Sequence, residues 1–328
     1  MIRSDQITAF VSASGFGDWT FTPLVADASA RRYLRGSQGE TSVILMDAPP
    51  DSGEDITPFL DVSKMLHGFD LTAPKIIAED AKAGFILMQD FGDNLVAHHC
   101  AEQPEDEVEI YRTSIDVLAE LSKHPAPAAL EPYDRTTYHR EANLVHQWYL
   151  QNIDETARDA FAAALDQALD QLSVQNPVLV MRDYHAENLI WRAHETGTDR
   201  LGLLDYQDAL AGHPAYDIVS LIEDARRPLG DGVFEATLTY ASDTLGIERD
   251  TLRQDVAILG AQRNLKIIGI FARLYLRDGK PKYPPMIPHV WRLLQNDLAH
   301  PACNGLRNWC AAYLPEPTDD LIDRMLNP

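Results

Sequence analysis

The chain changes its hydrophobic pattern close to residue 92, and this change limits the folds that it can adopt. Before that point, short apolar runs of strand length alternate with turn-forming residues. Beyond it, apolar positions recur at the three- and four-residue spacing of amphipathic helices over most of the chain. A strand-rich segment followed by a helical one predicts an α+β fold, here with one lobe over residues 1–92 and a second over residues 93–328.

The strand and helix signals of the two segments can be placed by residue range. In the first segment we expect a short helix and a loop within 1–20, strands at 21–25, 32–35, 41–46, 75–78 and 84–88, and a helix at 56–69. Gly36 and Gly39 are expected to supply the turn between the second and third strands. In the second segment we expect helices at 107–123, 135–151, 155–173, 214–228, 231–245, 249–278 and 287–298, a strand at 178–181, and a hairpin from 188–191 and 201–204.

The charge balance of the chain restricts its partners. Fifty Asp and Glu residues stand against 28 Lys and Arg residues, which gives a formal net charge of −22. A chain this acidic repels nucleic-acid phosphates, so we expect no nucleic-acid partner. The excess of carboxylates is consistent with a solvated acidic surface, and also with a cationic substrate.

Cysteine usage and hydropathy indicate the compartment. Cys100, Cys303 and Cys310 are scattered and form no C-x-x-C pair, which predicts neither a disulfide framework nor a zinc site. No long apolar run follows the first residues, and no stretch reaches the roughly 18 uninterrupted apolar residues of a membrane span. We therefore expect a cytoplasmic protein without a signal peptide or a membrane span, and no obligate protein partner is evident.

The segment from Met181 to Asn188 carries the residues most suited to chemistry. Asp183 and Asn188 are separated by four residues, so one loop presents a carboxylate at one end and an amide at the other. An apolar strand then leads to Asp205, whose carboxylate would lie opposite Asn188 and suit a hard cation such as Mg²⁺. Asp183 and Asn188 alone would also fit an ordinary turn and cap. Asp205 and the order of the lobes favour phosphoryl transfer, which needs an aligned hydroxyl, a carboxylate and Mg²⁺.

These residues resemble a known superfamily. Residues 182–188, Arg-Asp-Tyr-His-Ala-Glu-Asn, are similar to the catalytic loop of the aminoglycoside-phosphotransferase and protein-kinase-like proteins, and Asp205 matches the metal-binding aspartate of their second motif. Within that superfamily the chain most resembles the bacterial N-acetylmuramate/N-acetylglucosamine anomeric kinases of cell-wall recycling. The narrower match is carried by residues 27–35, 45–50, 205–209 and 216–221. The resemblance implies a bilobal kinase-like fold with a small antiparallel-sheet lobe and a large helical lobe.

The resemblance also implies a role for each residue of the catalytic region. Asp183 would be the catalytic base or the group that orients the acceptor hydroxyl. Asn188 and Asp205 would hold Mg²⁺, Asp217 would buttress the catalytic loop, and His185 would orient that loop or contact the substrate.

The nucleotide, ATP or GTP, would be held by residues of the strand-rich lobe. The resemblance implies that the strand end at Gln89 and Asp90 meets the adenine through its backbone. No G-x-G-x-x-G phosphate loop is present. The turn after Asp27 is therefore expected to hold the phosphates with Ser29 and backbone N–H groups, together with Arg31 or Arg32.

Three further features depart from the usual kinase pattern or imitate it. Met181 stands where the catalytic triplet usually has His, and the third strand, residues 43–47, contains no Lys. Asp90-Phe91-Gly92 looks like the metal-binding D-F-G motif but precedes Asp183 in the chain, whereas the metal-binding aspartate should follow it. We interpret it as a turn where the lobes join.

Candidate residues for the acceptor site come from two expected helices. Arg263, Lys266, Arg273 and Arg277 fall on one face of the helix expected at 249–278. This basic face suits the substrate or the phosphates, or else forms salt bridges with nearby carboxylates. Glu141, on another expected helix, is a further candidate for the wall of the acceptor site. The substrate candidates are therefore Glu141, Arg263 and Lys266.

Three functions are consistent with these observations. The first is a small-molecule kinase that transfers the γ-phosphate of ATP to the anomeric hydroxyl of an amino sugar. The second is a phosphotransferase for an aminoglycoside or another small alcohol, which would use an acidic acceptor pocket. The third is a pseudokinase-like binding module, supported by Met181 and the missing third-strand Lys. The presence of Asp183, Asn188 and Asp205 together argues against this third function.

Overall fold

The computed structural model describes residues 2–24, 31–150 and 153–326, and the chain forms two compact units. The first unit contains Met1–His99 and Glu187–Ala209, and the second contains Cys100–Ala186 and Leu210–Pro328. Each unit is built from two segments of the chain. The later segment joins the first unit because its backbone N–H groups at Leu203 and Trp191 donate to the carbonyls of Thr72 and Asn94 at 2.9 and 2.8 Å.

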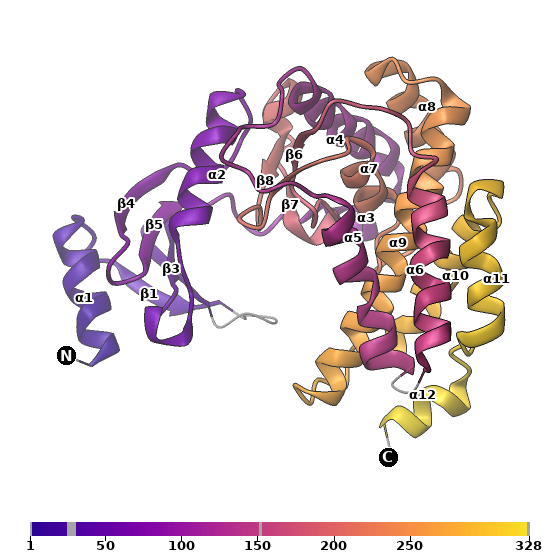
Figure 1. Ribbon diagram of the computed structural model, residues 1–328. Helices are drawn as coiled ribbons and strands as arrows, with labels where there is room; N and C mark the ends of the chain where they lie inside the picture. Colours follow the sequence, from indigo (N-terminus) through magenta and orange to yellow (C-terminus); the bar gives the residue numbers. More distant parts are fainter. Residues whose placement is uncertain (1, 25–30, 151–152, 327–328) are drawn as a thin grey trace. The chain divides into compact units, whose positions relative to one another are not determined.

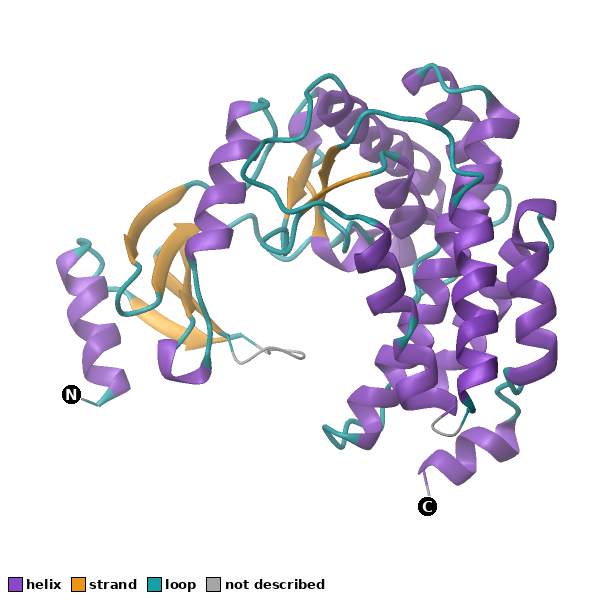
Figure 2. Ribbon diagram, in the orientation of Figure 1, coloured by secondary structure: helices purple, strands orange, loops and turns teal. Residues whose placement is uncertain are grey.

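A five-stranded antiparallel sheet forms the centre of the first unit (Figures 1 and 2). The strands lie in the order β1-β2-β3-β5-β4. Their bounds are β1 Thr20–Pro23, β2 Arg32–Gln38, β3 Thr41–Asp47, β4 Ile76–Asp80 and β5 Phe85–Gln89, with α1 (Arg3–Ala13) before β1 and α2 (Thr57–Gly68) between β3 and β4. The five predicted strands and both predicted helices of this segment are confirmed. Val43, Leu45 and Leu87 on one face of the sheet form a core with Val11 of α1.

Gly36 has a different role from the predicted one. It lies inside β2, opposite Val43 of β3 and Phe21 of β1. A Cβ atom at this position would lie 2.5 Å from the Phe21 ring, so only glycine allows the ring to cover the strand. The turn itself runs through Gly39, whose φ of +61° favours glycine. The turn prediction is thus right for Gly39 and wrong for Gly36.

The predicted hairpin of residues 188–204 is present in the first unit. Its strands are β7 (Leu189–Trp191) and β8 (Leu201–Leu203), paired antiparallel. Phe91 packs against Gly202, where a Cβ atom would lie 2.7 Å from the ring. The hairpin therefore joins the segment that follows β5 through both backbone hydrogen bonds and close packing.

The second unit is mainly helical and is arranged around one long buried helix, α9 (Figure 1). Its helices are α4 Glu107–Ser122, α5 Arg135–Ala142, α6 Glu155–Leu169, α7 Ala215–Ile222, α8 Val233–Leu245, α9 Arg249–Leu276, α10 Ile287–Leu298, α11 Asn304–Tyr313 and α12 Asp319–Leu326. Helix α3 (Val96–Glu102) spans the boundary between the units, and strands β6 (Val178–Val180) and β9 (Leu210–Gly212) form a two-stranded sheet. Helix α9 packs against α5, α7, α8 and α10. None of the helices in the described ranges is both long enough and apolar enough to cross a membrane.

Each helix predicted for this unit is present, but not every boundary is as predicted, and the unit contains further helices. The expected helix at 135–151 is interrupted, because α5 ends at Ala142 and a π-helical segment occupies Val145–Leu150. Helix α7 ends at Ile222, well before the expected residue 228. Helices α3, α11 and α12 and strand β9 were not predicted. The interruption lies where Gly269 of α9 closely approaches the backbone of Leu144 and Val145.

Gly269 supports a testable prediction about this crossing. A Cβ atom there would lie 2.3 Å from the carbonyl carbon of Leu144 and 2.5 Å from the amide nitrogen of Val145. Since backbone atoms cannot move aside cheaply, we expect Gly269→Ala to destabilise the second unit by roughly 1–3 kcal/mol or more. Urea unfolding followed by circular dichroism measures the effect.

A matched control is available in α2. Gly68 lies in a helix with no heavy atom within 4 Å of its Cβ position. Gly68→Ala is expected to be neutral or to stabilise by about 0.5–1 kcal/mol. Equal unfolding midpoints for the two variants would contradict the proposed close approach at Gly269.

Candidate active site

The loop from Met181 to Asn188 follows strand β6 and has an unusual backbone at its start. Arg182 adopts a φ of +71°, the left-handed region that a residue with a large side chain rarely occupies. Such a conformation costs on the order of 1–3 kcal/mol and persists only where the surroundings hold it, often at functional sites. Asp205 is also left-handed, with a φ of +55°. The strained positions therefore include both motifs that the sequence singled out.

Helix α7 holds the first residues of this loop. The buried carboxylate of Asp217 accepts hydrogen bonds from the N–H groups of Met181 at 2.6 Å and Arg182 at 2.8 Å. The hydroxyl of Ser220, one turn further along α7, donates to the Arg182 carbonyl at 3.0 Å. Burial raises the pKa of Asp217 to about 7, although the two N–H donors oppose this rise. Both peptide groups of Arg182 are therefore attached to α7, where the sequence places a buttress for the loop.

Asp183 follows directly and is exposed to solvent. Its N–H donates to the Met181 carbonyl at 2.9 Å, and its own carbonyl accepts from the N–H of His185 at 3.0 Å. The surrounding protein opposes ionisation, but nearby positive charges, with Lys266 foremost and Arg263 and Arg182 contributing, outweigh it and hold the pKa of Asp183 below its ordinary value. Asp183 is thus an exposed, ionised carboxylate at neutral pH. Such a group can accept a hydrogen bond from a hydroxyl.

His185 points into the protein interior. Its side chain is buried, and its Nε2 atom lies 2.9 Å from the guanidinium of Arg226. Burial, with a contribution from Arg226, lowers the pKa of His185 to about 4, so the imidazole is neutral at pH 7. Because the guanidinium only donates, Nε2 is the acceptor and Nδ1 carries the proton. This placement suits orientation of the loop, as the resemblance implies, better than contact with a substrate.

Asn188 and Asp205 lie together in the first unit. The hairpin brings them together: the N–H of Leu204 donates to the Asn188 carbonyl at 3.0 Å, and Asn188 Nδ2 lies 3.4 Å from Asp205 Oδ2. Gln207 Nε2 donates to Asp205 Oδ1 at 2.9 Å, while its buried Oε1 has no hydrogen-bond partner. A carboxylate, an amide and an unsatisfied amide oxygen form an all-oxygen donor set that fits Mg²⁺. Among the residues that the structure describes, no three His, Cys, Asp or Glu side chains form a metal-binding group.

Of the residues predicted to hold the phosphates, Arg31 lies near the predicted metal ligands. Ser29 lies outside the described residues. Arg31 pairs with Glu54 at 2.7 Å, and the charge of Asp208 is among the influences on its pKa. Next to it, burial and then the charge of Asp205 raise the pKa of Tyr33 to about 12. Arg31 therefore lies on the side of the first unit that carries the predicted metal ligands.

Arg32 is engaged elsewhere. Its guanidinium pairs with Asp47, the fully buried last residue of β3. Arg3 of α1 donates to the same carboxylate at 2.9 Å. Two arginines from other elements thus neutralise a carboxylate in the strand that usually carries the kinase lysine. Sequence reasoning did not identify Arg3, because it is 44 residues away from Asp47 in the chain.

The segment after β5 forms a turn held by Arg35. The N–H of Gln89 donates to the Lys75 carbonyl at 2.9 Å. Asp90 pairs with Arg35 at 2.6 Å and accepts a hydrogen bond from the N–H of Gly92 at 2.8 Å, where φ is +83°. These contacts agree with the interpretation of Asp90-Phe91-Gly92 as a turn. That Gln89 and Asp90 meet the adenine stays a prediction.

The three substrate candidates all lie in the interior of the second unit. Both Glu141 oxygens contact cations, Arg182 at one and Lys266 at the other, the latter at 2.8 Å. Arg263 donates to Ser220 Oγ at 2.9 Å and to the Glu223 carbonyl at 3.3 Å. Arg263 and Lys266, on the basic face of α9, are therefore buried. Lys266 forms a salt bridge with a carboxylate, which is one of the two roles that the sequence left open for this face. Contact of these residues with a substrate stays a prediction.

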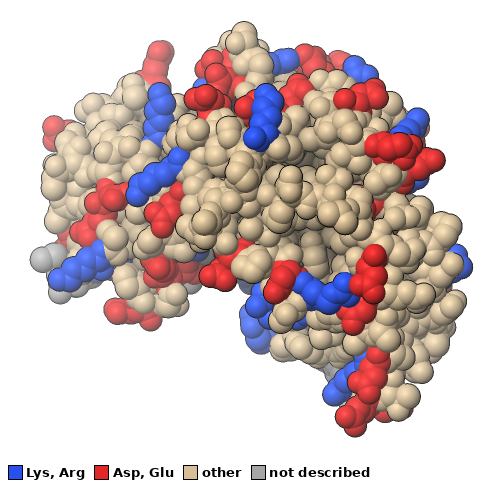
Figure 3. All heavy atoms as spheres, turned by 45° about the horizontal axis from the view of Figure 1, so that its top comes forward, with Lys and Arg blue, Asp and Glu red and all other residues tan. Residues whose placement is uncertain are grey.

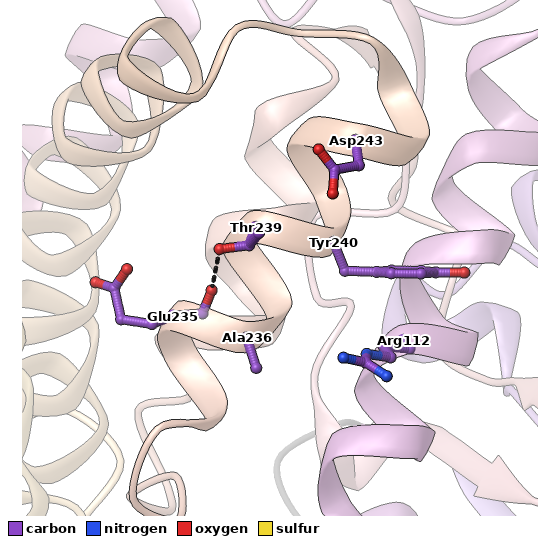
Figure 4. Close-up of a pocket in the computed structure, with 6 residues that line it drawn as sticks. All are labelled: Arg112, Glu235, Ala236, Thr239, Tyr240 and Asp243. Atoms are coloured by element: carbon purple, nitrogen blue, oxygen red, sulfur yellow. Dashed lines mark hydrogen bonds between the residues drawn. The ribbon is translucent and has the colours of Figure 1, made fainter.

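A pocket of about 300 Å³ lies elsewhere in the second unit, between α4 and α8 (Figure 4). It is lined by Arg112, Glu235, Ala236, Thr239, Tyr240 and Asp243. The Thr239 hydroxyl is turned back to its own helix, donating to the Glu235 carbonyl at 2.8 Å. None of the predicted site residues lines this pocket, so it is separate from the candidate active site.

Charged side chains of both signs lie interspersed on the face of the molecule that Figure 3 shows. Many carboxylates also pair with a neighbouring cation, as Glu235 does with Arg249 and Arg253 at 3.0 and 2.6 Å. This arrangement agrees with a solvated acidic surface as the explanation of the net charge of −22.

Comparisons with known proteins show the family of the chain. Residues 20–253 match the model of the phosphotransferase enzyme family. A protein of Caulobacter vibrioides named N-acetylmuramate/N-acetylglucosamine kinase is 34% identical, over 96% of this chain and 98% of its own length. Proteins of the same name from Pseudomonas aeruginosa and Neisseria meningitidis are 33% and 34% identical, over 84% and 85% of this chain and 83% and 85% of their own lengths.

Solved structures with low sequence identity share the fold. A choline/ethanolamine kinase family protein from Mesorhizobium loti superposes with a TM-score of 0.63 at 14% identity, over 96% of this chain and all of its own. The GDP complex of an aminoglycoside 2'-phosphotransferase gives 0.63 at 16% identity, over 91% and 99%. The fold and the paired motifs define a kinase-like phosphotransferase. The chain belongs to the phosphotransferase enzyme family and is a small-molecule kinase, as the sequence predicts.

Proposed function

We propose that the chain transfers the γ-phosphate of ATP to the anomeric hydroxyl of N-acetylmuramate or N-acetylglucosamine. The observation that carries this proposal is the likeness over nearly the full length of both chains to the Caulobacter vibrioides protein named as a kinase of these two sugars. Two further relatives of the same name support it. Three free, buried cysteines agree with action in a reducing cytoplasm.

In this proposal the residues of the loop perform the chemistry at the acceptor. Asp183, exposed and ionised, accepts the hydrogen bond of the sugar hydroxyl and takes its proton as the new O–P bond forms and the bond from the γ-phosphorus to the bridging oxygen of the departing ADP breaks. Asp217 and Ser220 hold the peptide groups of Arg182, so the carboxylate next to it keeps one direction. The contribution to the rate is mainly positioning, since phosphoryl transfer requires little covalent help from the protein.

The nucleotide side of the reaction belongs to the first unit. Asn188 and Asp205 are the residues that would hold Mg²⁺, with Gln207 supporting Asp205. When bound, the ion neutralises charge on the phosphates. Arg31, which pairs with Glu54 and whose pKa is influenced by the charge of Asp208, is the arginine that would meet the phosphates.

The test is a nucleotide-consumption assay with a panel of acceptors and with both ATP and GTP. We expect turnover with N-acetylmuramate or N-acetylglucosamine, and none with the methyl glycoside of N-acetylglucosamine, whose anomeric oxygen carries no proton. Phosphorus NMR of the product identifies the phosphorylated position. Turnover of the methyl glycoside would refute the anomeric position, and turnover of kanamycin or choline alone would refute the amino-sugar assignment.

A further inference from the structure

The side chain of Arg182 is anchored as firmly as its backbone. Its guanidinium donates to Glu141 Oε1 of helix α5, and its charged group also lies over the Tyr133 ring, 5.6 Å from the ring centroid. Both partners of the ion pair are largely removed from solvent, with side-chain exposures of 19% and 8%. The residue with the strained backbone is therefore held at its peptide groups by α7 and at its tip by α5.

Glu141 connects this anchor to a second cation. Its Oε2 accepts hydrogen bonds from the Tyr133 hydroxyl and pairs with Lys266 Nζ of α9 at 2.8 Å. The hydroxyls of Tyr133 and Tyr216 are hydrogen-bonded to each other at 2.7 Å. Burial opposes the ionisation of Glu141, but Lys266 and Arg182 outweigh it and hold its pKa below the ordinary value. One buried carboxylate thus gathers residues from α5, α7 and α9 beneath the loop.

We propose that Glu141 is a positioning residue for phosphoryl transfer: through Arg182 it holds the left-handed turn that directs Asp183 outward. The proposal rests on the role proposed above for Asp183. A bond from Glu141 to the tip of Arg182 limits the rotation of that residue, and the Asp217 and Ser220 bonds alone leave the side chain without a fixed direction. In this role Glu141 acts on the reaction through Arg182, from the interior of the second unit.

Two substitutions of Arg182 that differ in their tolerance of a positive φ test this proposal. Glycine adopts positive φ values without steric cost, whereas methionine does not. If the ion pair serves to hold the left-handed turn, Arg182→Gly retains more activity than Arg182→Met, although both remove the guanidinium. If the guanidinium instead contacts a substrate or serves general stability, the two variants lose activity alike.

The experiment is a set of single and double variants assayed for kcat and KM at saturating nucleotide. We expect Glu141→Gln and Arg182→Met each to lower kcat by roughly 10- to 100-fold with KM nearly unchanged, as for other groups that position a reacting residue. In the double variant that combines Glu141→Gln with Arg182→Met, the two losses of kcat should not multiply, because both changes remove the same ion pair. Adding Glu141→Gln to Arg182→Gly should change kcat by less than about threefold, because glycine adopts the left-handed conformation without the ion pair to Glu141.

A matched control is available in the same unit. Glu107 is also buried and pairs with Arg227 at 2.7 Å, and its second carboxylate oxygen accepts a hydrogen bond from the N–H of Gly230, outside the loop. Glu107→Gln is expected to lower the unfolding midpoint as much as Glu141→Gln does, but to leave kcat within about twofold. An equal loss of kcat in both variants, or losses that multiply in the double variant, would overturn the proposal.

Failure of this proposal is distinguishable from failure of the proposed function. The acceptor panel and the wild-type chain decide the substrate, and Asp183→Asn decides the role of the loop carboxylate. The variants at Glu141 and Arg182 are then compared with any acceptor that the wild-type chain phosphorylates. If Asp183→Asn is inactive while Glu141→Gln keeps the wild-type kcat, the catalytic role stands and the positioning role of Glu141 is refuted.

Discussion

Asp183→Asn is expected to lower kcat by about 10²- to 10⁴-fold, the range typical of a lost general acid–base group. Asparagine keeps the shape of the side chain but cannot accept the hydroxyl proton. Since Asp183 is exposed and its neighbours Met181 and Arg182 are held by Asp217, the loop should keep its conformation. Nucleotide affinity, measured by isothermal titration calorimetry, should therefore be close to that of the wild-type chain. Steady-state kinetics measures the loss of kcat.

The control for this variant is an aspartate that does not belong to the candidate site. Asp170 forms an exposed ion pair with Arg135 at 2.5 Å, and Asp170→Asn should leave kcat within about twofold. A kcat for Asp183→Asn within tenfold of the wild-type value would refute its role as base or orienting group. It would also favour a binding site that uses Asp183 only for structure.

Asp205→Asn is expected to have the second largest effect, a loss of about 10³-fold in kcat/KM. Asparagine tolerates the left-handed backbone that Asp205 adopts, so the variant removes charge without adding strain. A metal ion held by Asn188 and Asp205 would then have a neutral amide in place of the Asp205 carboxylate, at an expected loss of several kcal/mol of charge stabilisation. At about 1.4 kcal/mol per tenfold in rate, this corresponds to roughly three orders of magnitude.

A titration of Mg²⁺ distinguishes a metal ligand from a structural residue. The Mg²⁺ concentration for half-maximal rate should rise in Asp205→Asn, while the unfolding midpoint changes little. The control is Asp61→Asn on α2 of the same unit, where the side chain is exposed and lies 3.7 Å from Lys64. An unchanged Mg²⁺ requirement in Asp205→Asn would contradict the proposed ligand set.

Much of the fold could be predicted because the relevant signals are local. Alternating and helical spacing of apolar residues located the five strands of the first sheet and the long helices of the second unit. The misplaced features depend on contacts distant in sequence. Gly36 looks like a turn residue until Phe21 is seen to cover it, and the predicted helix after residue 135 is broken where Gly269 of α9 approaches its backbone.

In the candidate site, too, some features follow from the local sequence and others from contacts between residues distant in the chain. Asp183, Asn188 and Asp205 follow a spacing that belongs to one short stretch of chain, and the structure places Asn188 and Asp205 together. Glu141 and Lys266 pair with each other although 125 residues separate them in the chain, and their contact with a substrate stays a prediction. No periodicity in the sequence indicates such a pair, because each residue alone is compatible with an exposed helix face.

The sequence by itself therefore determined the chemistry: a carboxylate, an amide and a second carboxylate at spacings that a loop and a hairpin satisfy locally. Only the tertiary structure decided how that chemistry is held. At the left-handed turn, Asp217 and Ser220 of α7 hydrogen-bond the peptide groups of Arg182, and Glu141 of α5 pairs with its guanidinium. A buried carboxylate costs free energy unless such partners converge on it, and their convergence is a property of packing rather than of any segment of the chain.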